Sequence, residues 1–132
     1  MTAEHTHWIN GQWVAGKGGA FESVDPARNE VIWQGNAADV TQVDSAMQAA
    51  RAAFVDWSRK SVNERLVIIR AFANELGERK EHLARVIAQE TGKPVWETLT
   101  EVGAMIGKIE ISARAYEERT GTVENEMPGA KA

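Results

Sequence analysis

The three histidines, His5, His7 and His82, are the side chains in this sequence best suited to metal binding or to proton transfer near neutral pH. His5 and His7 stand two residues apart in a polar N-terminal stretch, where they could form only a weak metal-binding pair. His82 lies among charged residues on the expected polar face of a helix. We therefore expect all three imidazoles to be solvated, and we predict no metal site.

Candidate nucleophiles are equally scarce. The sequence contains no cysteine, so this chain by itself cannot perform thiol-based covalent catalysis, form a disulfide bond or bind a metal through thiolates. A serine nucleophile needs a positioned base, and none of the serines has such a setting: Ser23, Ser45, Ser58, Ser61 and Ser112. Carboxylates alternate with basic residues, as in Glu75 and Arg79, which is typical of helix-stabilising pairs. We assign no catalytic residue.

Two glycine patterns deserve a functional test. Gly16-Lys17-Gly18-Gly19 lacks the strand–GxxxxGK[ST]–helix order of a phosphate-binding loop, so we interpret it as a flexible loop of a hairpin. No GxGxxG motif is present, and we assign no cofactor-binding residue. Gly103 and Gly107, four residues apart on one helix, indicate close approach of another backbone rather than a binding site.

Composition narrows the class of protein. The chain has 132 residues, 43% of them hydrophobic and 26% charged, which is ordinary for one globular domain. Its net charge of −4 argues against a general nucleic-acid binder. Because no apolar run approaches the roughly 18 residues of a membrane span and the first residues lack a hydrophobic signal core, we expect a cytoplasmic protein.

The first third of the chain predicts a short antiparallel β element over residues 8–36, after a disordered lead-in at residues 1–7. Asn10-Gly11 lies between two short apolar runs and is typical of a type I′ hairpin turn. Residues 21–24 and 30–35 favour strands, and the turn between them runs from Asp25 to Asn29.

Three long amphipathic helices are predicted over residues 39–121. The first, 39–59, has Asp39 as its N-cap, and the second, 62–91, begins with a capping box formed by Ser61 and Glu64. Gly92 ends the second helix, and Pro94 suits the first turn of the third. Residues 122–132 are expected to be a linker or a truncated end.

The third helix is apolar on more than one side. It carries Val95, Met105 and Ile111 away from its main apolar stripe. Such a helix needs neighbours on more than one side, and a hairpin with three helices does not supply them. We therefore expect the chain to be part of something larger or to self-associate.

A series of short motifs has a recognisable order. The motifs are Trp8-Ile9-Asn10-Gly11-Gln12-Trp13-Val14, Asp25-Pro26 with Glu30-Val31-Ile32, Ala49-Ala50-Arg51-Ala52-Ala53-Phe54 with Trp57, Glu64-Arg65, Glu90-Thr91-Gly92-Lys93-Pro94 and Glu101-Val102. In this order they resemble the N-terminal segment of the NAD(P)-dependent aldehyde dehydrogenase superfamily over residues 8–128. The resemblance implies an α+β fragment of an α/β enzyme.

Further strings are most similar to succinylglutamate semialdehyde dehydrogenases of arginine catabolism. They are Val31-Ile32-Trp33-Gln34-Gly35-Asn36, the run from Thr100 to Ile109, Arg119-Thr120-Gly121 and Glu126-Met127-Pro128. This similarity implies oxidation of N-succinylglutamate semialdehyde to N-succinylglutamate with NAD⁺. The sequence departs from the pattern at Gly107, where Asn is expected, and at the turn from Asp25 to Asn29.

The resemblance covers roughly the first quarter of such an enzyme. In the family, the cysteine nucleophile, the glutamate base, the asparagine that stabilises the oxyanion and the loop at the nicotinamide cofactor all lie beyond this stretch. We therefore expect this chain alone to be inactive and to bind no NAD. Its expected partner is the remainder of the dehydrogenase chain or a second copy of itself, and the full-length enzyme is expected to be a homo-oligomer.

One substrate-facing surface follows from the resemblance, which implies that the third helix forms a wall of the substrate entrance. Met105, Lys108 and Ser112 share a face of that helix, and we expect them to border the aldehyde channel in the complete enzyme. Lys108 could attract a dicarboxylate substrate there, and the favoured alternative is that it is an ordinary surface lysine. The alternative function is a stand-alone helical module that self-associates through its apolar helix faces.

Overall fold

The computed structural model describes residues 6–122, 126–127 and 129–131. Three separate two-stranded antiparallel sheets and four helices make up this part of the chain. The elements are β1 (His7–Ile9), β2 (Gln12–Val14), β3 (Ala20–Asp25), β4 (Glu30–Asn36), α1 (Val40–Arg59), α2 (Val62–Glu78), α3 (Lys80–Thr91), α4 (Val95–Arg119), β5 (Glu126–Met127) and β6 (Ala130–Lys131). Short antiparallel strands followed by long helices are the fold class that the sequence predicts.

The two predicted N-terminal hairpins form where local turn chemistry places them. Asn10 and Gly11 both have positive φ, 50° and 76°, as a type I′ turn requires, and Trp8 of β1 pairs with Trp13 of β2. In the second hairpin, Asp25 is buried and its Oδ1 accepts hydrogen bonds from the backbone N–H groups of Ala27 and Arg28. The side chain of Asp25 therefore organises the turn that joins β3 to β4.

Both predicted helix N-caps are formed. The Asp39 carboxylate accepts the N–H of Gln42 at 2.8 Å, and the Ser61 hydroxyl accepts the N–H of Glu64 at 3.2 Å. In each case the third residue reaches back to the N-cap backbone, which completes a capping box. Gly92 ends α3 with φ of 74°, and Pro94 immediately precedes the first residue of α4.

The predicted second helix, 62–91, is divided in two, so the chain has four helices rather than three. The break falls at Arg79, whose φ and ψ are −101° and 11° and whose N–H bonds to Glu75 O. Gly77, a weak helix former, precedes the break. Apolar residues recur at helical spacing on both sides of the break, with Leu66, Ile69 and Leu76 before it and Leu83 and Ile87 after it, so the pattern does not reveal it. Packing of α3 against α4 accompanies the change of direction after Arg79.

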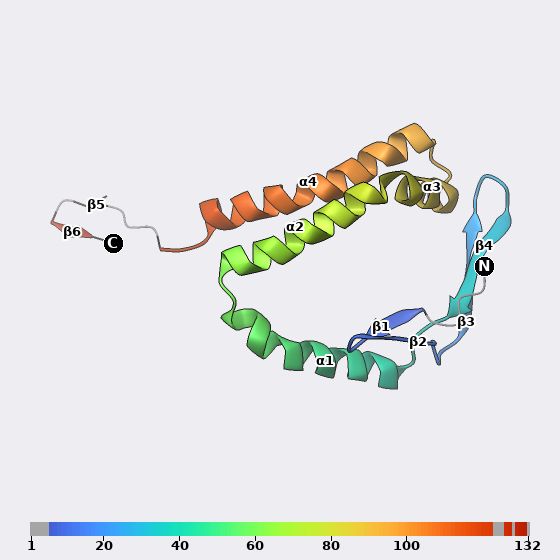
Figure 1. The fold of residues 1–132 in the computed structure, drawn as a ribbon, viewed down its shortest axis with the longest axis horizontal. Helices are drawn as coiled ribbons and strands as arrows, with labels where there is room; N and C mark the ends of the chain where they lie inside the picture. Colours follow the sequence, from blue (N-terminus) through green and yellow to red (C-terminus); the bar gives the residue numbers. More distant parts are fainter. Residues whose placement is uncertain (1–5, 123–125, 128, 132) are drawn as a thin grey trace.

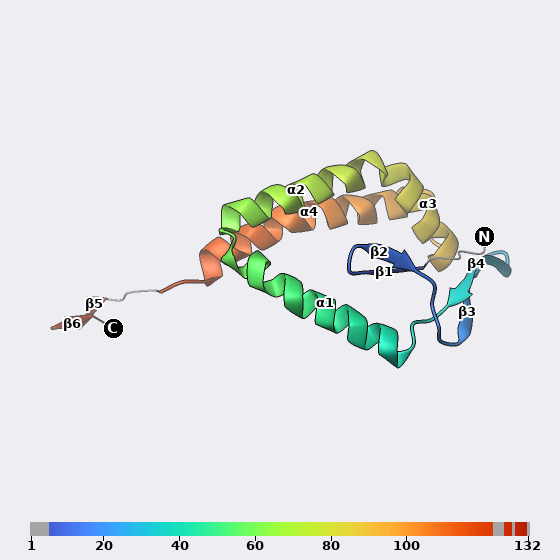
Figure 2. The same cartoon turned by 60° about the horizontal axis from the view of Figure 1, so that its bottom comes forward.

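The four helices are arranged openly, without a common central core. In Figures 1 and 2, α2 and α4 lie side by side, α3 closes one of their ends, and α1 runs away from the start of α2. The β3–β4 hairpin lies against α3, where the Ser23 hydroxyl donates to Glu90 Oε1 at 3.1 Å. Each of the four described helices is too short or too polar to span a lipid bilayer.

Few side chains are fully enclosed. Within the described residues, the buried hydrophobic residues are Ala84 and Val102, which lie with buried Thr98 where α3 meets α4. Large apolar side chains elsewhere stay accessible, for example Met47 at 67% and Trp96 at 70%. The expectation that the helices need neighbours beyond this stretch agrees with these exposed faces.

The two ends of the chain carry the remaining predictions. Most of the expected lead-in at 1–7, including His5, lies outside the described residues, whereas His7 begins β1. The expected linker at 122–132 also lies partly outside them, and its described residues include the antiparallel pair β5 and β6.

Candidate functional site: an apolar groove between α2 and α4

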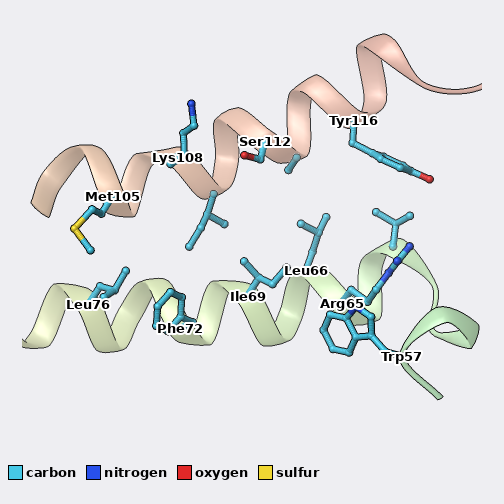
Figure 3. Close-up of a pocket in the computed structure, with 13 residues that line it drawn as sticks. Trp57, Arg65, Leu66, Ile69, Phe72, Leu76, Met105, Lys108, Ser112 and Tyr116 are labelled. Carbon is cyan, nitrogen blue, oxygen red and sulfur yellow. The ribbon is translucent and has the colours of Figure 1, made fainter. Parts of the chain in front are cut away.

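A groove with a volume of about 640 Å³ lies between α2 and α4. Such a volume falls in the range of small-molecule pockets. Apolar side chains from both helices face one another across it, with the last turns of α1 at one end (Figure 3). The lining residues are Trp57, Val62, Arg65, Leu66, Ile69, Phe72, Leu76, Met105, Lys108, Ile109, Ser112, Ala113 and Tyr116.

All three residues predicted to border a substrate channel line this groove. Met105, Lys108 and Ser112 come from successive turns of α4. In Figure 3 the Met105 side chain points toward α2, whereas the Lys108 ammonium points away from it. The methylene stem of Lys108 therefore contributes to the wall, and its charge is placed outside the gap between the two helices.

The α2 side of the groove was not predicted. Leu66, Ile69, Phe72 and Leu76 form this wall, and none of them is among the residues that we expect from the sequence to border the channel. Phe72 is 58% exposed, although the aromatic ring lines the groove. An apolar stripe in a sequence does not reveal whether another part of the same chain covers it, which is why this wall could not be recognised.

The charged residues of the groove are both basic. Arg65 and Lys108 line it, and no carboxylate belongs to its described lining. Figure 3 shows Arg65 at the same end as Trp57 and Tyr116. The groove thus has an apolar floor with Arg65 at one end, whereas the Lys108 ammonium lies outside the gap between the helices.

An ion pair beside the groove joins its two walls. Arg70 of α2 meets Glu110 of α4 through two contacts, Nε to Oε1 at 2.8 Å and Nη2 to Oε2 at 3.0 Å. The hydrogen bond to Glu110 raises the pKa of the Arg70 guanidinium, and the hydrogen bond from Arg70 lowers the pKa of the Glu110 carboxyl. Both side chains are more than half exposed, so water screens the pair.

A second charged cluster holds the start of α4. The Lys93 ammonium bonds to Glu101 and lies 3.4 Å from Glu97. The hydrogen bond to Glu101 is the main reason that the pKa of Lys93 is raised. Because every charge in this cluster has a partner within the chain, we interpret it as a structural element.

The described histidines do not form a metal-binding or catalytic site. His82 is exposed, as expected, whereas His7 is half-buried in β1 and its Nε2 lies 3.1 Å from Asn36 O. His7 is thus part of a strand and not of a solvated tail. Among the residues that the structure describes, no group of three His, Cys, Asp or Glu side chains could hold a metal ion.

The glycine loop at 16–19 joins the two hairpins and is held in place, which corrects its interpretation as a flexible loop of a hairpin. Buried Gln42 accepts the Lys17 N–H at 2.8 Å and donates to Ala15 O at 2.7 Å. Gly18 N donates to Ala37 O at 2.8 Å. Two of the loop amides therefore form hydrogen bonds within the chain.

The predicted close approach at Gly103 and Gly107 is not made within the described residues. A Cβ atom at Gly103 would lie 3.8 Å from Lys80 Nζ, and one at Gly107 would meet nothing within 4 Å. This side of α4 is available to a neighbour that the described residues do not provide.

A comparison with known families identifies the class of protein. The sequence matches the description "Aldehyde dehydrogenase family" over residues 13–132, which is most of the chain. The chain therefore belongs to the aldehyde dehydrogenase family.

Solved structures agree with this assignment. An NAD-dependent benzaldehyde dehydrogenase from Corynebacterium glutamicum matches 96% of the chain with a TM-score of 0.81 and 25% identity, over 28% of its own length. An NADP-dependent glyceraldehyde-3-phosphate dehydrogenase from Bacillus halodurans matches 86% with a TM-score of 0.79 and 28% identity, over 24% of its length. A betaine aldehyde dehydrogenase from Staphylococcus aureus, in complex with NAD⁺, matches 95% with a TM-score of 0.80 and 25% identity, over 26% of its length. The chain spans about a quarter of each of these proteins.

Proposed function

We propose that this chain is the N-terminal part of an NAD-dependent aldehyde dehydrogenase that oxidises N-succinylglutamate semialdehyde to N-succinylglutamate. The observation that carries the proposal is that nearly the whole chain matches the aldehyde dehydrogenase family and about a quarter of the length of solved dehydrogenases. The strings at residues 31–36 and 100–109 support the particular substrate. Cytoplasmic location and homo-oligomeric assembly of the complete enzyme are part of the same proposal.

The chain alone is expected to be inactive. It contains no cysteine, and the family mechanism that the resemblance implies depends on a cysteine nucleophile. In the glycine loop, the N–H groups of Lys17 and Gly18 are already bonded to Gln42 and Ala37. We therefore place the NAD site in the remainder of the enzyme and assign none of its contacts here.

The first test uses the purified 132-residue chain. It is mixed with NAD⁺ and a panel of aldehydes that includes the succinylated semialdehyde, and NADH formation is followed by absorbance. We expect no NADH above the protein-free control. Formation of NADH by this chain would overturn the assignment of the catalytic groups to the remainder.

The expected partner of the groove is the rest of the dehydrogenase. Its apolar floor and its exposed Phe72 favour burial against another protein segment. If the two parts are produced separately and mixed, we expect a complex in sizing chromatography and recovery of dehydrogenase activity. If the chain instead stays a compact, stable monomer and forms no complex with the rest of the enzyme, the result would favour an independent interaction module.

Substrate recognition is tested in the complete enzyme at Lys108. If its ammonium attracts the dicarboxylate, Lys108→Met raises KM for the succinylated substrate and leaves KM for an uncharged aldehyde unchanged. Lys60→Met is the matched control, because Lys60 is exposed and lies outside the groove lining. An unchanged KM for the succinylated substrate would remove Lys108 from the proposal while leaving the family assignment intact.

A further inference from the structure

We draw no further inference here: the strongest candidate, the apolar groove between α2 and α4, belongs to the site already described, and nothing in the structure shows what else covers it.

Discussion

The hydroxyl of Thr98 donates a hydrogen bond to the backbone carbonyl oxygen of Ala84 at 2.7 Å, and both residues are completely buried. This contact joins the first turns of α4 to the middle of α3, beside buried Val102. Because so little of the chain is enclosed, this small cluster carries much of the specific packing between the two helices. The packing of α3 on α4 in turn positions the β3–β4 hairpin.

Replacing Thr98 by Val tests that contact. Valine keeps the branched shape and removes the donor, so we expect the free energy of unfolding to fall by about 1 kcal/mol. Urea denaturation followed by circular dichroism measures the change. Thr100→Val is the matched control, because Thr100 is exposed and water replaces its hydrogen bond to Glu97 O. Equal effects of the two substitutions would show that the Thr98 hydroxyl has no special role.

Gly92 and Gly107 are expected to respond to alanine substitution in opposite directions. Gly92 has φ of 74°, and an added Cβ would lie 3.1 Å from Pro26 Cγ, so Gly92→Ala combines backbone strain with a tight contact. We expect a loss of stability of about 1–2 kcal/mol from the left-handed backbone alone.

Gly107→Ala is the counterpart of Gly92→Ala. Gly107 lies inside α4 and faces open space, so alanine improves helix propensity and is expected to stabilise this chain by about 1 kcal/mol. Thermal unfolding of both variants measures the two effects. A destabilised Gly107→Ala chain would mean that a neighbour, such as a second copy, already occupies that side of α4.

The parts of the fold that the sequence predicts correctly depend on interactions between residues close along the chain. The Asn10-Gly11 turn needs only positive φ at two positions, and the Ser61–Glu64 capping box spans four residues. Gly92 ends a helix through its own backbone freedom. Each of these signals is complete within one turn of the chain, so no knowledge of distant packing is required.

Longer-range features could not be predicted in the same way. The apolar stripe continues through Arg79, and only the packing of α3 on α4 reveals that the chain turns there. Gln42 looks like an ordinary capping partner, yet it also clamps a loop 25 residues earlier. The groove illustrates both cases. The resemblance to a family predicts its α4 wall, whereas its α2 wall is visible only once the structure shows that α2 packs beside α4.

The Arg70–Glu110 pair predicts a salt-sensitive coupling between α2 and α4. A double-mutant cycle with Arg70→Met and Glu110→Gln is expected to give a favourable interaction at low ionic strength that weakens as salt is added. Arg70→Lys should lose much of the coupling, because a lysine ammonium cannot reproduce the two-point contact.

The control for this cycle lies within one helix. Arg85 and Glu81, four residues apart on α3, form a single 3.1 Å contact, and their coupling should be the weaker of the two. Urea unfolding at several salt concentrations provides the measurements. A coupling between Arg70 and Glu110 that does not respond to salt would contradict the assignment of an exposed electrostatic contact.

Acid should destabilise the chain through three hydrogen-bonded carboxylates. A backbone hydrogen bond from Gln42 is the main cause that lowers the pKa of Asp39, the Ser61 hydroxyl lowers that of Glu64, and Arg70 lowers that of Glu110. A depressed folded-state pKa means that the unfolded chain binds protons first. The contribution is therefore complete above the ordinary values of 3.8 for Asp and 4.5 for Glu, and it is lost as the pH falls through the lower folded-state values.

The unfolding free energy measured from neutral to acidic pH should decline in that window, and Glu64→Gln should make the decline shallower by removing one of the three titrating groups. Glu78→Gln is the matched control, since Glu78 is an exposed carboxylate at the end of the same helix and outside its capping box. If both variants keep the acid dependence of the parent chain, the Glu64 carboxylate does not stabilise the start of α2 through its charge. The capping box would then act only through hydrogen bonds that a neutral side chain can also make.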